Sequence, residues 1–298
     1  MSVEGPPAPR PQDPPADGPP VRTAFLGTSW FAADVLRRLV AADRAPGLVI
    51  TRPDRPAGRG RKLTPPPVAD AALELGLPLL QPETLDDDVV RRIAAVEPDA
   101  LIVCAYGAIV KEPLLSAHPI LNVHPSLLPR WRGAAPVERA IMAGDAETGV
   151  SIMELVEALD AGPVQLQESL PIGPDDTYGD VAPKLVELGS DLLLRALDEV
   201  AAGTLTATPQ PDEGITYAEK IVAADRDLDP AAPARVQHDH VRALAPHIGA
   251  RLKQEDGSYL GVRRTAVAAD GTLELLEVQP PGKSPMTYAD YLRGRDAR

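Results

Sequence analysis

Short apolar runs alternate with amphipathic segments along the first half of the chain. The apolar runs are residues 21–27, 47–51, 77–81, 99–106 and 119–123. Segments with helical spacing of apolar residues lie between the earlier runs, at 31–42, 68–76 and 86–96. The run at 99–106, DALIVCAY, has the continuous apolar character of a strand buried on both faces. This alternation predicts an α/β fold, with a doubly wound, mostly parallel, Rossmann-like sheet.

The pattern changes in the second half of the chain. A helix is expected at 136–144, two strands at 148–156 and 163–172, and a long helical segment at 176–203, broken near its glycines. A polar, proline-containing stretch at 205–215 indicates a linker. The remainder, 216–298, contains apolar runs around turns and predicts a smaller, β-rich, barrel-like (OB-like) domain. Residues 1–20 are dominated by proline and indicate a disordered tail before the main domain, 21–204.

The composition indicates an acidic globular protein. The net charge is -13, which argues against general nucleic-acid binding unless the charge is locally reversed. The single cysteine, Cys104, cannot form an internal disulfide and should pack as a small hydrophobe. No stretch has the roughly 20 apolar residues of a membrane-spanning helix, and residues 1–20 lack the apolar centre of a signal peptide. We therefore expect a cytoplasmic protein without a membrane partner. We also expect the protein to be a monomer.

The strongest chemical signal follows the last of the early strands, in LNVHPSLLPRWRGAAP at 121–136. Asn122 and His124 are two residues apart, so in an extended backbone their side chains project on the same side. A third polar residue, Asp160, lies in LDAG between two expected strands, where a carboxylate could orient an imidazole or assist proton transfer. Each of these residues alone is more often structural than functional. No histidine or cysteine neighbours His124 at ligand spacing, so no metal site is expected.

The combination N-x-H-x-S-L-L-P and, further along, L-D-x-G resembles the signature of formyltransferases that use 10-formyltetrahydrofolate. The resemblance implies that Asn122, His124 and Asp160 catalyse formyl transfer. Asn122 and His124 would stabilise the oxyanion that forms when an amine attacks the formyl carbon, and Asp160 would take part in the proton relay. The resemblance also implies a folate site along three segments: Tyr106, Gly107, Ile109, Val110, Ser126, Leu127, Leu128, Pro129 and Val156.

A basic segment at 52–63, RPDRPAGRGRKL, resembles the tRNA-contacting loop of the methionyl-tRNA formyltransferases. The segments 130–136 and 144–153 resemble the same family, which implies initiator Met-tRNA as a partner and a role in translation initiation. The implied tRNA-binding residues are Arg52, Arg55, Arg59, Arg61, Lys62, Arg130 and Arg132. A flexible, basic loop suits contact with phosphates. In the C-terminal domain, whose implied role is also tRNA binding, VRALAPHIGARL lacks the tryptophan that the family usually carries.

Other functions remain open from the sequence. A formyltransferase acting on an amino-sugar nucleotide would account for the acidity, although not for the basic segment at 52–63. A non-catalytic RNA-binding protein would not require Asn122, His124 and Asp160 together. A nicotinamide-dependent oxidoreductase is disfavoured, because FLGTSWFA lacks the G-x-G-x-x-G phosphate turn.

Overall fold

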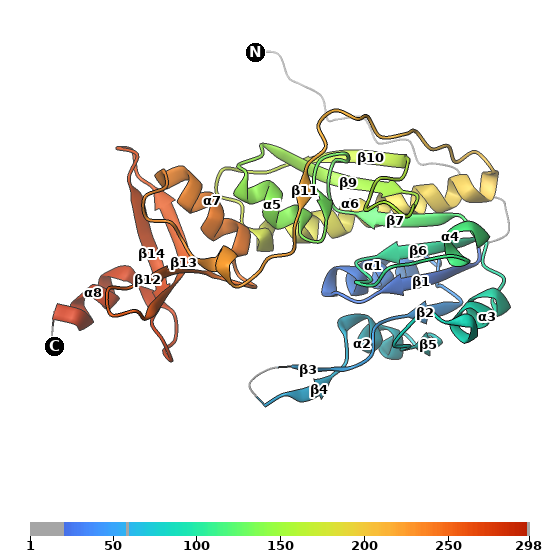
Figure 1. Ribbon diagram of the computed structural model, residues 1–298, viewed down its shortest axis with the longest axis horizontal. Helices are drawn as coiled ribbons and strands as arrows, with labels where there is room; N and C mark the ends of the chain where they lie inside the picture. The colour runs from blue at the N-terminus through green and yellow to red at the C-terminus, as the bar shows by residue number, and fades with distance from the viewer. Residues whose placement is uncertain (1–20, 58–59, 297–298) are drawn as a thin grey trace, which may run out of the picture.

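A seven-stranded sheet in the order β10-β9-β7-β6-β1-β2-β5 forms the centre of the larger domain (Figure 1). The structure is a computed structural model, and it describes residues 21–57 and 60–296. The parallel strands are β1 (Thr23–Gly27), β2 (Leu48–Ile50), β5 (Leu79–Leu80), β6 (Ala100–Cys104) and β7 (Ile120–His124). Two antiparallel strands, β9 (Glu147–Met153) and β10 (Val164–Pro171), extend the β7 edge. The predicted doubly wound, mostly parallel sheet is confirmed.

Helices pack on both faces of this sheet. Helices α1 (Trp30–Ala41), α2 (Pro67–Glu74) and α6 (Tyr178–Ala202) share one apolar core, and α3 (Asp87–Ala95) and α4 (Leu114–Ala117) belong to the other. Alternate side chains of strand β7 enter the two cores, which lie on opposite faces of the sheet. Leu121 and Val123 enter the first core and Ile120 enters the second. Asn122 and His124 therefore project to the same side as Ile120, at the carboxyl end of the strand.

Helix α6 continues through the glycines at which we expected a break. Gly189 faces the sheet, where an added Cβ would lie 3.1 Å from Val123 Cγ1. The missing side chain lets the helix approach the sheet closely, and the hydrogen-bonded backbone does not need to end there. The helix ends at Gly203, whose φ of 67° is the left-handed conformation that glycine adopts readily.

The basic segment at 52–63 is a β-hairpin and not an irregular loop. Strand β3 (Arg55–Ala57) pairs antiparallel with β4 (Lys62–Thr64), and Arg61 enters β4 from a left-handed conformation with φ of 47°. The hairpin projects away from the central sheet (Figure 1). Arg59, another implied tRNA contact, lies outside the described residues.

The C-terminal part forms a separate antiparallel sheet in the order β12-β13-β14-β15, which fits the predicted barrel-like domain (Figure 1). Its strands are β12 (Ala250–Lys253), β13 (Tyr259–Val267), β14 (Leu273–Gln279) and β15 (Met286–Thr287). The 3-10 turn η1 (Ala224–Arg226) and helices α7 (Ala234–Leu244) and α8 (Tyr288–Asp296) complete this part. The division into domains at 205–215 stays a prediction. The sequence pattern did not predict α4, α7 or α8, nor the pair β8 (Arg132–Gly133) and β11 (Tyr217–Ala218).

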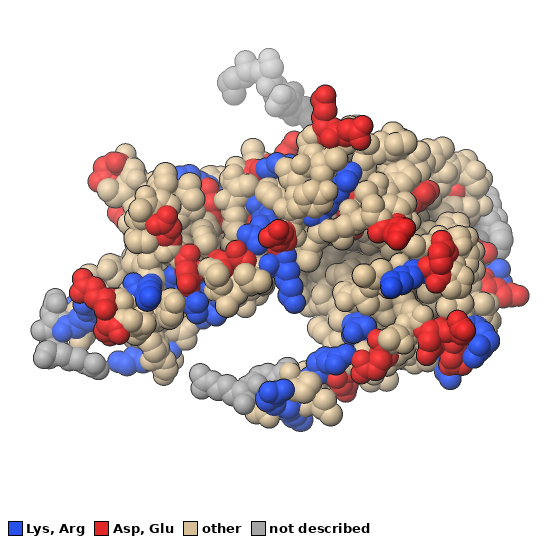
Figure 2. All heavy atoms as spheres, in the orientation of Figure 1, with Lys and Arg blue, Asp and Glu red and all other residues tan. Residues whose placement is uncertain are grey.

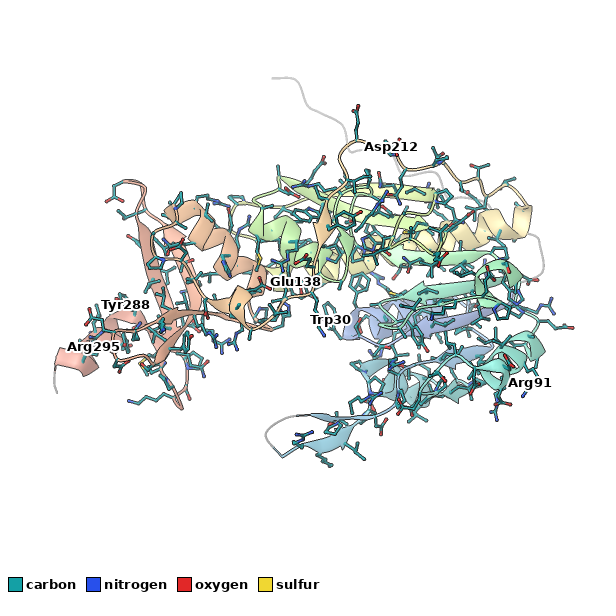
Figure 3. All side chains as sticks on the ribbon, in the orientation of Figure 1. Trp30, Arg91, Glu138, Asp212, Tyr288 and Arg295 are labelled. Carbon is teal, nitrogen blue, oxygen red and sulfur yellow. The ribbon has the colours of Figure 1, made fainter. Side chains whose placement is uncertain are left out.

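An aromatic stack joins the C-terminal part to the core, where α7 packs against α5 (Pro136–Met142). The rings of Tyr178 and His247 are stacked with centroids 3.8 Å apart, and Trp30 meets Tyr178 edge-on at 6.3 Å. His247 Nε2 lies 3.1 Å from Glu138 Oε1. Figure 3 shows Trp30 and Glu138 near one another where the two parts meet. These contacts, between Trp30, Tyr178 and Glu138 of the core and His247, hold the C-terminal part against the core.

Cys104 lies fully buried in the first apolar core, as the sequence predicted. Burial raises the pKa of its thiol, so the thiolate form is strongly disfavoured. Across the described residues, we find no helix with the length and apolar character needed to cross a membrane.

Candidate active site

Two side chains predicted to be catalytic lie together at the carboxyl end of β7. Asn122 pairs in register with Val103 of β6 and Met153 of β9, and His124 with Ser151 of β9. Both side chains are buried. The Asn122 amide makes no side-chain hydrogen bond with any other residue in the described ranges, although buried polar groups are normally paired. Its N–H groups are therefore available to a ligand at the strand end.

The His124 imidazole is held between a backbone carbonyl and a carboxylate. Its Nε2 lies 2.9 Å from the carbonyl oxygen of Trp131, and its Nδ1 lies 3.8 Å from Asp160 Oδ2. Because a carbonyl oxygen can only accept a hydrogen bond, Nε2 carries a proton in this arrangement. The other ring nitrogen, Nδ1, faces the Asp160 carboxylate. The structure thus brings His124 and Asp160 together, although they are far apart in the sequence.

Asp160 is fixed by the segment that follows the signature loop. Its Oδ2 accepts a hydrogen bond of 2.8 Å from the backbone N–H of Gly133, and its own backbone adopts a left-handed φ of 45°. Gly133 is required there, because its φ is 125° and an added Cβ would lie 2.6 Å from the carbonyl oxygen of Ala218. Gly133 lies in the segment 130–136 that resembles the family, but the resemblance did not predict its role as a donor to Asp160.

The signature loop at 126–129 is held mainly from inside the protein. The Ser126 hydroxyl donates to the Arg130 carbonyl at 2.7 Å, and Ser151 Oγ donates to the Ser126 carbonyl at 2.7 Å. Ser126 and Leu128 are buried, and the implied contacts of this loop with folate stay a prediction. Leu127 and Pro129 remain partly exposed. The loop therefore acts as a support for the segment that carries Trp131.

A small cavity of about 250 Å³ lies beyond the end of β6. Tyr106 is buried beside it, and its carbonyl accepts a 2.7 Å hydrogen bond from Thr28 Oγ1. Gly107, with φ of 75°, turns the chain so that Ile109 is 77% exposed at the cavity wall, whereas Val110 is buried. Such exposure of a large apolar side chain next to a cavity suits an apolar ligand.

A second exposed apolar stretch is the loop that leads to Asp160. Val156 is 42% exposed and Leu159 is 60% exposed. Both lie in the stretch 156–160, along which the resemblance to the formyltransferases implies the folate site.

The side chains implied to contact tRNA differ in their exposure and in whether they already pair with a group of the protein. Arg55 pairs with Glu83 at 2.7 Å between exposed side chains, while Arg61 and Lys62 are exposed. Arg52 is half-buried and donates to the Glu83 carbonyl at 3.1 Å. Figure 2 shows the molecule hollowed between the hairpin, the core and the C-terminal part, with Lys and Arg side chains around the hollow. Exposed cations, Arg61 and Lys62, therefore lie on the hairpin of this acidic protein, and Asp and Glu side chains also border the hollow.

The two arginines after the signature loop face in different directions. Arg130 is partly exposed and pairs with Asp145 at 2.6 Å, and this carboxylate raises the pKa of the guanidinium. Arg132 is buried and donates to Gln210 Oε1 at 2.8 and 3.1 Å. Pairing of β8 with β11 accompanies this buried position of Arg132, and its implied contact with tRNA stays a prediction. Gln210 itself was not predicted.

The doubly wound sheet and the separate small β-rich part are the arrangement found in formyl transferases, and the comparison with known proteins gives the same class. The formyl transferase family matches residues 21–197 of the chain. A methionyl-tRNA formyltransferase from Halorhodospira halophila is 44% identical over 298 aligned positions, covering 92% of this chain and 96% of that protein. The chain therefore belongs to the methionyl-tRNA formyltransferase family.

More distant solved structures share the fold. HypX from Aquifex aeolicus has a TM-score of 0.63 at 18% identity, over 91% of this chain but only 48% of HypX. A sugar N-formyltransferase from Shewanella gives the same TM-score and identity over 84% of this chain and 99% of that enzyme. At this level of identity the likeness supports the α/β core with its smaller C-terminal part, and it does not choose among formyl acceptors.

Proposed function

We propose that this protein transfers the formyl group of 10-formyltetrahydrofolate to the amino group of methionine on initiator Met-tRNA, a reaction that prepares the tRNA for translation initiation. The observation that carries the proposal is the convergence of Asn122, His124 and Asp160 at one strand end, with Nδ1 and Oδ2 3.8 Å apart. The identity of the formyl acceptor, Met-tRNA, is inferred from the family to which the chain belongs. Met-tRNA as the partner implies a cytoplasmic enzyme, and we expect it to act as a monomer.

The proposed chemistry exchanges one carbon–nitrogen bond for another. The methionine amine attacks the formyl carbon, and the formyl oxygen becomes an oxyanion in a tetrahedral intermediate. The unpaired Asn122 amide donates a hydrogen bond to this oxygen, and His124 adds positive charge once Nδ1 is protonated. The amine loses a proton, the bond from the formyl carbon to folate N10 breaks, and N10 gains a proton. Asp160 stabilises the proton during its transfer from the amine to N10, because its carboxylate faces His124 Nδ1.

The proposed folate site lies between the turn after β6 and the loop before Asp160. Ile109 and Val156 offer exposed apolar surface on these two segments, and Tyr106 forms part of the cavity wall. Main-chain groups of Gly107 and its neighbours would supply polar contacts to the pterin. Of the signature loop, Leu127 and Pro129 keep some exposure and remain candidates.

The proposed tRNA contacts lie on the β3–β4 hairpin and beside the active site. Arg61 and Lys62 are exposed on the hairpin, and Arg130 lies next to Trp131, whose carbonyl holds His124. Arg52 and Arg55 have protein partners in Glu83 and would contact phosphate only after exchanging them. The C-terminal part would bind a more distant region of the tRNA across the hollow seen in Figure 2.

An acceptor test decides between this proposal and the sugar-nucleotide alternative. The purified protein is incubated with 10-formyltetrahydrofolate and either Met-charged initiator tRNA or an amino-sugar nucleotide, and the formylated product is measured. Formylation of Met-tRNA alone is expected. Formylation of the amino-sugar nucleotide alone would replace the proposal, and product from neither acceptor would favour the non-catalytic RNA-binding alternative.

A further inference from the structure

The chain that leaves the catalytic core passes along the start of β10 and the backbone of residues 131–132 before it enters the C-terminal part. Thr208 forms a two-way backbone bridge with Val164 at the start of β10, with both hydrogen bonds at 2.8 Å. Further on, Thr216 Oγ1 accepts from the backbone N–H of Trp131 at 2.9 Å, and the Thr216 carbonyl accepts from Arg132 N at 2.9 Å. Gln210 lies between these two anchors, so its backbone is held on both sides.

The Gln210 side chain uses its amide fully. Its Nε2 donates to the carbonyl oxygens of Asp160 at 2.8 Å and Gly162 at 2.7 Å. Its Oε1 accepts two hydrogen bonds from the buried Arg132 guanidinium. Two N–H donors and one oxygen with two lone pairs are thus all paired, which fixes the amide in one orientation. Because the Arg132 guanidinium is charged, its hydrogen bonds to Gln210 Oε1 are stronger than hydrogen bonds between neutral groups.

The Asp160 backbone needs such support. It adopts a left-handed φ of 45°, which non-glycine residues adopt rarely. Within the described residues, the Asp160 carbonyl has Gln210 as its hydrogen-bond donor, and the preceding loop is exposed at Val156 and Leu159. The Asp160 carboxylate faces His124, so a shift of this backbone changes the geometry of the trio directly.

We propose that Gln210 is a positioning residue for formyl transfer, holding Asp160 at its working distance from His124 from outside the catalytic core. The inference rests on the proposed function of the trio. The same linker also holds Trp131, through Thr216, and the Trp131 carbonyl binds the other nitrogen of His124. Both partners of the imidazole are therefore fixed by the segment that connects the two parts of the protein.

Two variants separate the bonds to Asp160 from the bonds to Arg132. Gln210→Met keeps the shape of the side chain and removes all four hydrogen bonds. Gln210→Glu keeps an acceptor for Arg132 and removes the N–H donors. We expect kcat to fall about 10–100-fold in both variants, because small misplacements of catalytic groups have costs of this size. The KM values for Met-tRNA and for 10-formyltetrahydrofolate should change less than about threefold, since all four hydrogen bonds of the Gln210 amide are made within the protein.

A matched control accounts for loss of stability. Gln279 of β14 also joins an arginine, Arg263, to a backbone carbonyl, that of Lys283 at 2.8 Å. Gln279→Met measures how far the melting temperature falls when such a bridge is lost away from the trio. If Gln210→Met lowers the melting temperature by a similar amount while kcat falls only in Gln210→Met, folding does not explain the loss of activity.

A double variant tests whether Gln210 acts through Asp160. Asp160→Ala alone should lower kcat strongly, and adding Gln210→Met should lower it no further, because the group being positioned is gone. Unchanged kcat in Gln210→Met, wild-type kcat in Gln210→Glu, or an additive loss in the double variant would overturn the proposal. Failure of the proposed function is a separate result, since wild-type protein would then not formylate Met-tRNA.

Discussion

The salt dependence of tRNA binding tests the hairpin most sharply. Arg61 and Lys62 are exposed, whereas the Arg55 guanidinium is already paired with Glu83 at 2.7 Å. We therefore assign two phosphate contacts to Arg61 and Lys62 and none to Arg55. Each lost contact should flatten the log–log salt dependence of binding by about 0.9 on a duplex. Arg61→Gln/Lys62→Gln should then reduce the slope by about 1.8.

This slope change predicts a measurable difference between two salt concentrations. From 50 to 200 mM salt, wild-type affinity for Met-charged initiator tRNA should fall about twelvefold more than that of the variant, since a fourfold change acts on a slope difference of about 1.8. The matched control is Arg91→Gln/Arg92→Gln, which removes the same charge from α3. Figure 3 shows Arg91 at the end of the core away from the C-terminal part. A hairpin variant whose slope equals that of wild type would refute the assignment, as would a control that flattens the slope equally.

Three further predictions concern the trio, its loop and the domain junction. His124→Ala and Asp160→Asn should each lower kcat by about 10²–10³ without a change in circular dichroism, and near-normal turnover in either would contradict the catalytic roles. Gly162→Ala should cost at least about 1–3 kcal/mol of unfolding free energy in urea titrations, because its Cβ would lie 1.9 Å from the Glu154 carbonyl oxygen; unchanged stability would contradict this packing. Burial raises the pKa of Tyr178 to about 12 from an ordinary 10.0, so its contribution to stability should be complete below pH 10 and lost as pH rises towards 12. Tyr178→Phe should remove this part of the alkaline dependence, and an unaltered pH profile of unfolding would contradict the prediction.

The sequence predicted those features of the site that depend on local pattern. Asn122 and His124 could be placed because a continuous apolar run identifies a buried strand, and residues two apart on a strand share a side. Asp160 was assigned by resemblance, and its 3.8 Å approach to His124 comes from the pairing of β7 with β9 and the loop that follows. The parallel order of the early strands followed from the same alternation of apolar runs with helices.

The features that the sequence did not predict depend on contacts between distant segments. The sequence predicts that Arg132 is a surface cation, but in the structure its backbone pairs with Tyr217 and its side chain is buried. Gln210 carries no local signal, because its partners are 48 and 50 residues away. Gly189 resembles a helix breaker until the sheet that packs on α6 is known.

Formylation kinetics with matched acceptors test the central claim most directly. Wild-type protein and Asn122→Ala are compared in single-turnover reactions with 10-formyltetrahydrofolate and Met-charged initiator tRNA, and N-formylmethionine released from the tRNA is quantified. We predict rapid formylation by wild-type protein and a rate about 10²–10³ lower for Asn122→Ala, because the free amide at the end of β7 is assigned to the oxyanion. Equal rates for the two proteins, or no formylation of Met-tRNA by wild type, would contradict the account.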